Sequence, residues 1–255
     1  MKPARAWIAI VIVCATQASG NAGAADLLRV GGKIVKWASP ESGSPALITY
    51  MALTEALVVP SGKRTLSPDN CGAMRPFADI TTASPNVPPA LARTALSSAF
   101  QAWENVANIR FVEVDDVRHA NIVVGAAVSS RGRAFANLTL RDGMDGAPIA
   151  KSLGQSAPDR PQPLRRPASD DAAEIEQAYV CLNPTARWKT GFDGDLAVYD
   201  LRFTFVHEIG HAIGLDHPGS SGSVMGYRYD EHVTSLQPAD IDAVQRLYGA
   251  SGHGN

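Results

Sequence analysis

The segment His207-Glu-Ile-Gly-His211 places two imidazoles where they could serve one metal ion. On a helix, residues four apart lie on the same face, so both histidines can present ring nitrogens to a common centre. Gly214 can take the left-handed conformation that ends a helix in a sharp turn, and this turn would bring His217 back as a third ligand. The spacing predicts a catalytic zinc site with three neutral imidazoles and an open fourth position.

Glu208 is the candidate general base of this site. It follows the first ligand and points to a different side of the helix, where it can face a water molecule in the open position. Zinc lowers the pKa of such a water to roughly 7, and a carboxylate within reach can accept its proton and deliver it to a leaving amine. The predicted chemistry is hydrolysis of an amide bond.

A chance cluster of histidines on a helix is the alternative interpretation, because a bare HExxH pattern is weak evidence. Gly214, His217 and the helical context add three constraints, and together they favour the metal site. Apolar residues flank the motif and would hold its helix against a core: Phe203, Phe205, Val206, Ile209, Ala212 and Ile213.

Strands and helices around the motif must position it. Runs rich in Val, Ile and Phe predict strands at Ala46–Val59, Ile109–Val114, Asn121–Ala126, Ala134–Leu140 and Tyr179–Asn183. Helices are expected from Pro88-Pro89 to about Val106, from about Tyr199 to Ile213, and over Pro238–Tyr248, where proline begins the helix and Gly249 follows its end. The first helix carries Leu96, Phe100 and Trp103 on one face, which indicates core packing.

Two proline-rich stretches are expected to be loops. Pro60–Pro89 should be mostly irregular. Arg141–Glu176 contains prolines, arginines and small polar residues, which predicts a long surface loop with a Pro-rich insertion at about 154–173. Its basic cluster is better explained by solvation than by a bound partner.

The N-terminus is typical of an export signal. Lys2 and Arg5 precede an apolar run that is too short to span a bilayer comfortably, and small residues follow up to Ala25. An uncleaved anchor and a lipoprotein start at Cys14 are the weaker alternatives. We therefore predict a signal peptide at 1–25 and a secreted or periplasmic protein without stable membrane association.

Composition narrows the possible partners. The chain has 255 residues, of which 45% are hydrophobic and 19% charged, and a formal net charge of -2. This charge gives no reason to expect a nucleic-acid partner, and we expect a monomer with one catalytic domain. Loss of Cys14 with the signal would leave Cys71 and Cys181, which suit one disulfide in an oxidising compartment and are too few for a Cys-based zinc site.

The zinc motif HEIGHAIGLDH and the following SVMGY resemble the metzincin metallopeptidases. Four flanking patterns are similar to matrixin catalytic domains: Lys36-Trp37 leading to ITY, AFQAWENVANIRFVEVDD, ANIVVGA and ADIDAVQRLYG. The resemblance implies an α+β catalytic domain over 37–250, after a short lead-in segment at 26–36 and before a tail at 251–255. Its twisted five-stranded mixed sheet would pack on two long helices, with a smaller C-terminal part ending in a third helix.

The resemblance also assigns roles near the metal. It places Met225 as an apolar support beneath the imidazoles and makes Ala134–Leu140 the edge of a cleft that binds extended substrates. Pro218 and Tyr227 depart from the matrixin pattern and look more like serralysins or astacins. Tyr227 is therefore a candidate to approach the zinc or to donate to the oxyanion.

One catalytic zinc ion is expected. The other histidines are His119, His232 and His253, and none lies in the Arg131–Asn183 region where matrixins carry a structural zinc. The acidic loop positions Asp142, Asp145, Asp193 and Asp195 could hold calcium, but solvated loop carboxylates are the favoured interpretation.

The function expected is a zinc endopeptidase acting on proteins or peptides. A catalytically dead relative that binds proteins in the same groove is a second hypothesis, which the intact Glu208 disfavours. A zinc hydrolase acting on a non-peptide amide is a third. Cys71 also has two interpretations: a matrixin-like switch cysteine that blocks the zinc, or a disulfide with Cys181, which export and the even cysteine count favour.

Overall fold

The computed structural model describes residues 26–39, 43–59, 70–129, 132–141, 172–218 and 222–252. The predicted signal peptide and most of the predicted Pro-rich insertion lie outside these ranges. The strands are β1 (Asp26–Leu27), β2 (Arg29–Val30), β3 (Lys33–Lys36), β4 (Ala46–Ala52), β5 (Leu57–Val58), β6 (Ala73–Arg75), β7 (Ile109–Glu113), β8 (Ile122–Ala127), β9 (Ala134–Leu140), β10 (Ala172–Leu182), β11 (Trp188–Lys189), β12 (Tyr199–Asp200) and β13 (Leu215–Asp216). The helices are α1 (Pro89–Glu104), α2 (Leu201–Ala212) and α3 (Pro238–Tyr248), with 3-10 turns at Phe77–Thr81 and Val117–His119.

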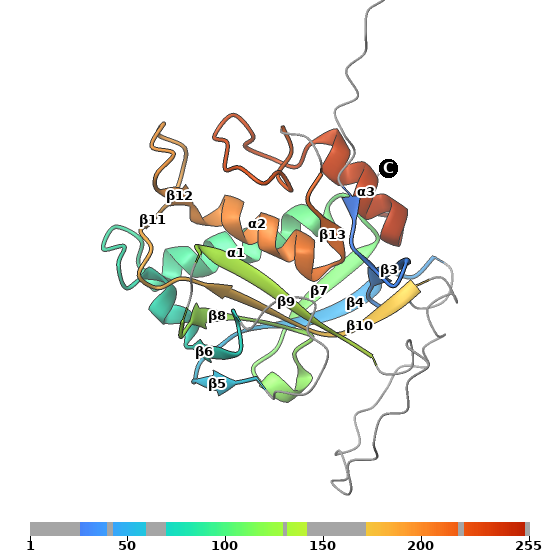
Figure 1. Cartoon of the computed structure of the whole chain (residues 1–255), viewed down its shortest axis with the longest axis horizontal. Coiled ribbons are helices and arrows are strands. Elements are labelled where there is room, and N and C mark those ends of the chain that lie inside the picture. Colours follow the sequence, from blue (N-terminus) through green and yellow to red (C-terminus); the bar gives the residue numbers. More distant parts are fainter. Residues whose placement is uncertain are drawn as a thin grey trace, which may run out of the picture.

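The expected α+β class is confirmed, with a mixed sheet and three helices. Its five long strands run in the order β7-β4-β8-β10-β9, in which neighbours are parallel except for the antiparallel pair β9 and β10. Four short strands, β2, β3, β5 and β6, join the same sheet, so the described sheet has more strands than the five expected. β9 therefore lies at the margin of the sheet nearest the helices (Figure 1).

Alternating side chains give the sheet two apolar faces. On β8, Ile122 and Val124 point into the main core, while Val123 points into a smaller core on the opposite face. The helices α1 and α2 cover the main-core face, where they pack against each other (Figure 1). The indole of Trp103, which is fully buried, donates to the carbonyl of Val206 at 3.0 Å. This bond ties α1 to the helix that carries the zinc motif.

The smaller core contains a disulfide between Cys71 and Cys181, whose Cα atoms are 5.7 Å apart. Cys181 lies on β10 directly opposite Phe135 of β9, and Cys71 precedes β6. The bridge thus fastens part of the first proline-rich stretch to β10, within the smaller core. It confirms the disulfide interpretation, and it excludes Cys71 as a switch cysteine while the bridge is intact.

Strand β10 is longer than the sequence predicts. It begins at Ala172, inside the stretch 141–176 that was expected to be a loop and at the end of the expected insertion at 154–173. The expectation was wrong for 172–176 because the strand is specified by its partners: Ala172 and Ala173 pair with β3, while Ile175 pairs with Leu140. The expected first strand over 46–59 likewise divides into β4 and the short β5.

The lead-in segment at 26–36 is integrated into the fold. It forms β1, β2 and β3, and β3 extends the main sheet by pairing with β10. β1 pairs with β13, immediately before His217. Across the described ranges, no helix has the length and apolar character needed to cross a bilayer.

Candidate metal centre

The helix α2 begins at a well-defined cap. The carboxylate of Asp200 accepts from the backbone N–H of Phe203 at 2.7 Å, as an N-cap residue does, and it also accepts from Gly191 at 2.6 Å. Burial raises the pKa of Asp200, while these two bonds oppose the rise. The cap sets the start of the helix and thereby the face on which His207 and His211 emerge.

The chain turns sharply at Gly214, two residues after the last residue of α2, for two physical reasons. The residue has a φ of 100°, which only glycine adopts readily. A Cβ there would also lie 2.1 Å from the carbonyl oxygen of Val35, so no side chain fits. The chain reverses at this point, runs through β13 and delivers His217 to the histidines of α2, as the spacing predicted.

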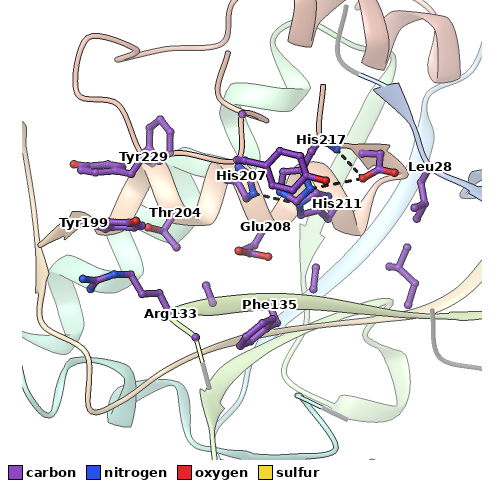
Figure 2. Close-up of a pocket in the computed structure, with 18 residues that line it drawn as sticks. Leu28, Arg133, Phe135, Tyr199, Thr204, His207, Glu208, His211, His217 and Tyr229 are labelled. Atoms are coloured by element: carbon purple, nitrogen blue, oxygen red, sulfur yellow. Dashed lines mark hydrogen bonds and ion pairs between the residues drawn. The ribbon is translucent and has the colours of Figure 1, made fainter. Parts of the chain in front are cut away.

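The three histidines form a compact cluster. One ligand atom from each of His207, His211 and His217 lies within 4.8 Å of the others. The Nε2 atoms of His207 and His211 are 3.2 Å apart. Figure 2 shows the cluster gathered above Glu208 at the centre of the site.

The hydrogen bonds of the histidines fix their tautomers. The Nδ1 of His207 lies 2.7 Å from the carbonyl oxygen of Val224, and the Nδ1 of His211 lies 2.9 Å from that of Leu215. Because a carbonyl only accepts, both Nδ1 atoms carry the proton and both Nε2 atoms present lone pairs. Two lone pairs facing at 3.2 Å repel unless a cation lies between them, so the residues fit a zinc ion.

Burial keeps these rings neutral. It lowers the pKa of His207 to about 4, and it also lowers the pKa values of His211 and His217. Neutral imidazole is the form that binds zinc. Burial acts in the opposite sense on Glu208, whose pKa it raises to about 8. A cation bound by the three imidazoles would oppose the effect of burial on Glu208, because a nearby positive charge favours the ionised carboxylate.

A cavity of about 560 Å³ contains the cluster. Glu208, only 7% exposed, points from α2 into the space between the helix and β9 (Figure 2). The strand β9 lines one side with Ala134, Phe135, Ala136 and Leu138, as the resemblance implied for this strand. Leu28 lies at one end, whereas Arg133, Tyr199, Thr204 and Tyr229 lie at the other. Asp216 and Phe203 also line the cavity.

Tyr227 lies over the third histidine. Its ring stacks on His217 with centroids 3.9 Å apart and planes 13° apart, and the residue is 77% exposed. Its hydroxyl therefore belongs to the mouth of the cavity, which it helps to line.

Met225 is fully buried beneath the zinc motif. It packs against Gly210, one residue before His211, and the carbonyl of the preceding Val224 accepts from His207. The turn that contains Met225 thus contacts the motif at His207 and at the residue before His211.

Asp240 is a site residue that the sequence reasoning missed. Fully buried, it accepts from the backbone N–H groups of Val224 at 2.9 Å, Met225 at 3.2 Å and Gln237 at 2.9 Å. One carboxylate thereby joins the cap of α3 to the turn beneath the metal site. Its position three residues after Gln237, at a helix start with Pro238, was a capping signal that could have found it.

Of the acidic positions considered for calcium, the structure describes Asp193 and Asp195, and neither belongs to a described group of metal-ligating side chains. Asp193 forms an ion pair with Lys189, and it accepts from the N–H of Asp195 at 3.0 Å. Asp142 and Asp145 lie outside the described residues. His119 and His232 lie beside Asp116 and Asp230 instead of the zinc motif. Within the described ranges, the three histidines are the one group of three or more metal-ligating side chains close enough to share an ion.

Comparison with known proteins agrees with this geometry. A sequence profile of the matrixin family matches residues 163–249, which include α2, the turn at Met225 and α3. Human matrix metalloproteinase-19 is 30% identical over 168 residues, which cover 64% of this chain and 27% of that protein. Metalloendoproteinase 1-MMP of Arabidopsis thaliana is 28% identical over 163 residues, covering 62% of this chain and 38% of that protein.

Serralysin of Photorhabdus luminescens is 34% identical over 192 residues, covering 62% of this chain and 33% of that protein. Similarity to both groups agrees with the mixture of matrixin-like and serralysin-like features around Met225. The matches support the expected resemblance to metzincins, with a matrixin-type region around the zinc motif. The matched region spans well under half of the length of each of these relatives.

Proposed function

We propose that this chain is a zinc-dependent endopeptidase that hydrolyses peptide bonds of protein substrates. The observation that carries the proposal is the joint placement of three neutral imidazoles and one buried carboxylate in a single cavity beside the marginal strand β9. His207, His211 and His217 would hold the ion. A zinc ion held there would supply Lewis acidity, which activates water and polarises the scissile carbonyl.

Glu208 performs the proton transfers in this proposal. Its carboxylate accepts a proton from the attacking water and delivers it to the nitrogen of the leaving amine. Burial raises the pKa of Glu208 to about 8 when no cation is bound, so a bound cation would favour the ionised carboxylate that accepts this proton. We propose that the hydroxyl of Tyr227 donates a hydrogen bond to the oxyanion. The stacking of Tyr227 on His217, at the mouth of the cavity, supports this role.

An extended peptide is the substrate form that the cavity supports. The strand β9 pairs with β10 and also lines the cavity that contains Glu208. A peptide lying along β9 would therefore run past Glu208. Main-chain hydrogen bonds to a strand provide affinity, while side chains enter pockets at either end. The aromatic end formed by Tyr199 and Tyr229, whose ring centroids are 4.3 Å apart, suits an apolar side chain.

We propose that the chain is exported, because the predicted signal peptide and the Cys71–Cys181 disulfide both indicate export. Disulfides persist in oxidising compartments, and the described cysteines, Cys71 and Cys181, are paired. A secreted or periplasmic location agrees with action on proteins outside the cytoplasm, and we propose that the mature chain acts as a monomer without stable membrane association.

Digestion of casein or gelatin by the purified protein, with and without phenanthroline, tests the proposal. Cleavage that stops with the chelator and returns with added zinc is expected. Absence of cleavage with zinc bound would favour a catalytically dead binding protein, and cleavage only of small non-peptide amides would favour the third hypothesis. Peptide-library profiling would then define the preferred bond.

A further inference from the structure

Three hydrogen bonds from outside the zinc motif, and one from His211, hold the turn between the second and third histidines. Four consecutive carbonyls, those of residues 212–215, each accept one hydrogen bond. Ala212 accepts from the indole of Trp37 at 2.9 Å, and Gly214 accepts from the N–H of Leu28 at 2.9 Å. The carbonyls of Ile213 and Leu215 accept from the hydroxyl of Tyr248 at 2.7 Å and from His211 at 2.9 Å.

Two of these donors belong to the N-terminal part of the chain, which lies far from the zinc motif in sequence. The third donor, the hydroxyl of Tyr248, also contacts the N-terminal part of the chain, because it accepts from the N–H of Trp37 at 3.0 Å. β1 adds a further constraint by pairing Leu27 with Leu215 and Asp26 with Asp216. The carbonyl of Val35 lies against Gly214 itself.

The turn decides where the third histidine lies. The last carbonyls of a helix have no partner within the helix, and a buried carbonyl without a partner is costly. Because residues 212–216 are the only covalent link between His211 and His217, their conformation sets the distance between these two imidazoles. Groups that orient metal ligands from outside the ligand set commonly change metal affinity by about 10–100-fold.

We propose that the lead-in segment and Trp37 are a positioning element of the metal centre. The N–H of Leu28 and the indole of Trp37 hold the turn so that His217 faces His207 and His211, and loss of either bond weakens zinc binding. This inference rests on the proposed function in one respect, since it requires that the three histidines bind zinc.

Zinc affinity of matched variants tests the inference. Leu28→Pro removes the N–H, whereas Leu28→Ala keeps it and is the control. Trp37→Phe removes the indole donor and retains an aromatic ring. Ile80→Val removes one methylene from the main core away from the turn, so it controls for a general loss of stability. Zinc dissociation constants come from competition with a chromophoric chelator, and visible spectra of cobalt-loaded proteins report the ligand geometry.

We expect the zinc dissociation constant to rise about 10-fold in Leu28→Pro and in Trp37→Phe, with altered cobalt spectra. Leu28→Ala and Ile80→Val should bind zinc as the unaltered protein does. Trp37→Phe decides the question by itself if Leu28→Pro does not fold. Normal zinc affinity and cobalt spectra in the donor-deleted variants would overturn this inference alone. Failure of the unaltered protein to bind zinc would overturn the proposed function as well.

Discussion

Gly210 and Met225 pack so closely that a Cβ on Gly210 would lie 2.3 Å from the sulfur of Met225. Real side chains do not approach at this distance, so the helix backbone itself lies against the methionine. Gly210 immediately precedes His211, and Val224, next to Met225, accepts a hydrogen bond from His207. The buried turn therefore contacts α2 at His207 and at the residue before His211.

Gly210→Ala is predicted to destabilise the protein. In an unhindered helix this change would stabilise by roughly 0.5–1 kcal/mol, because alanine loses less conformational freedom than glycine. Here overpacking against Met225 and Trp103 should cost about 1–3 kcal/mol, which reverses the sign. Urea unfolding of the metal-free proteins measures the difference. In combination with Met225→Ala, the two effects should be less than additive, and a more stable Gly210→Ala protein would contradict the contact.

One zinc ion per chain is predicted, because the described residues offer one histidine cluster. Metal analysis of the purified protein should give a ratio close to one. Phenanthroline should remove the ion and abolish proteolysis, and zinc should restore it. Two tightly bound zinc ions per chain would show that a second site exists.

Glu208→Ala is predicted to retain the fold and the zinc but to lose turnover by roughly 10²-fold or more. The reason is that the carboxylate moves protons and is not a ligand. His211→Ala is the matched comparison, since it should lose the metal and the activity together. Zinc content and kcat are measured on the same preparations. Proteolysis retained by Glu208→Ala would place the general base elsewhere.

Tyr227→Phe is predicted to lower kcat while leaving KM nearly unchanged. A hydrogen bond that forms with the oxyanion stabilises the transition state more than the bound substrate. The substitution keeps the ring that stacks on His217, so zinc affinity should not change. Tyr227→Leu, which also removes the stacked ring, distinguishes the hydroxyl from the packing. Full turnover in Tyr227→Phe would reduce the residue to a packing role.

The Cys71–Cys181 bridge is predicted to contribute about 4–5 kcal/mol to the free energy of unfolding, because it closes a loop with a sequence separation of 110 residues. Thiol titration of the unfolded, unreduced mature protein should find no free thiol. Denaturant unfolding of Cys71→Ser/Cys181→Ser measures the contribution. Two free thiols, with raised basal activity in Cys71→Ser, would instead support the switch interpretation.

The sequence by itself determined the local chemistry of the site. The spacing of His207 and His211 fixes their common face because a helix repeats every 3.6 residues, and Gly214 marks the turn because only glycine adopts its φ readily. The three helices were also predictable from local sequence, because each has start or stop signals, such as Pro238 and Gly249 around α3. The core positions of α1 followed from its periodicity.

Only the tertiary structure decided which distant groups complete the site. The start of β10 at Ala172 depends on pairing with β3 and β9, which local composition does not encode. No local pattern showed that Leu28 of the lead-in segment and Trp37 bind the turn before His217. Asp240 reaches Val224 and Met225 across a turn-rich stretch. Such contacts join residues up to 186 positions apart (from Leu28 to Gly214), and their partners are selected by packing of the whole chain, since a backbone N–H or carbonyl is chemically the same at every position.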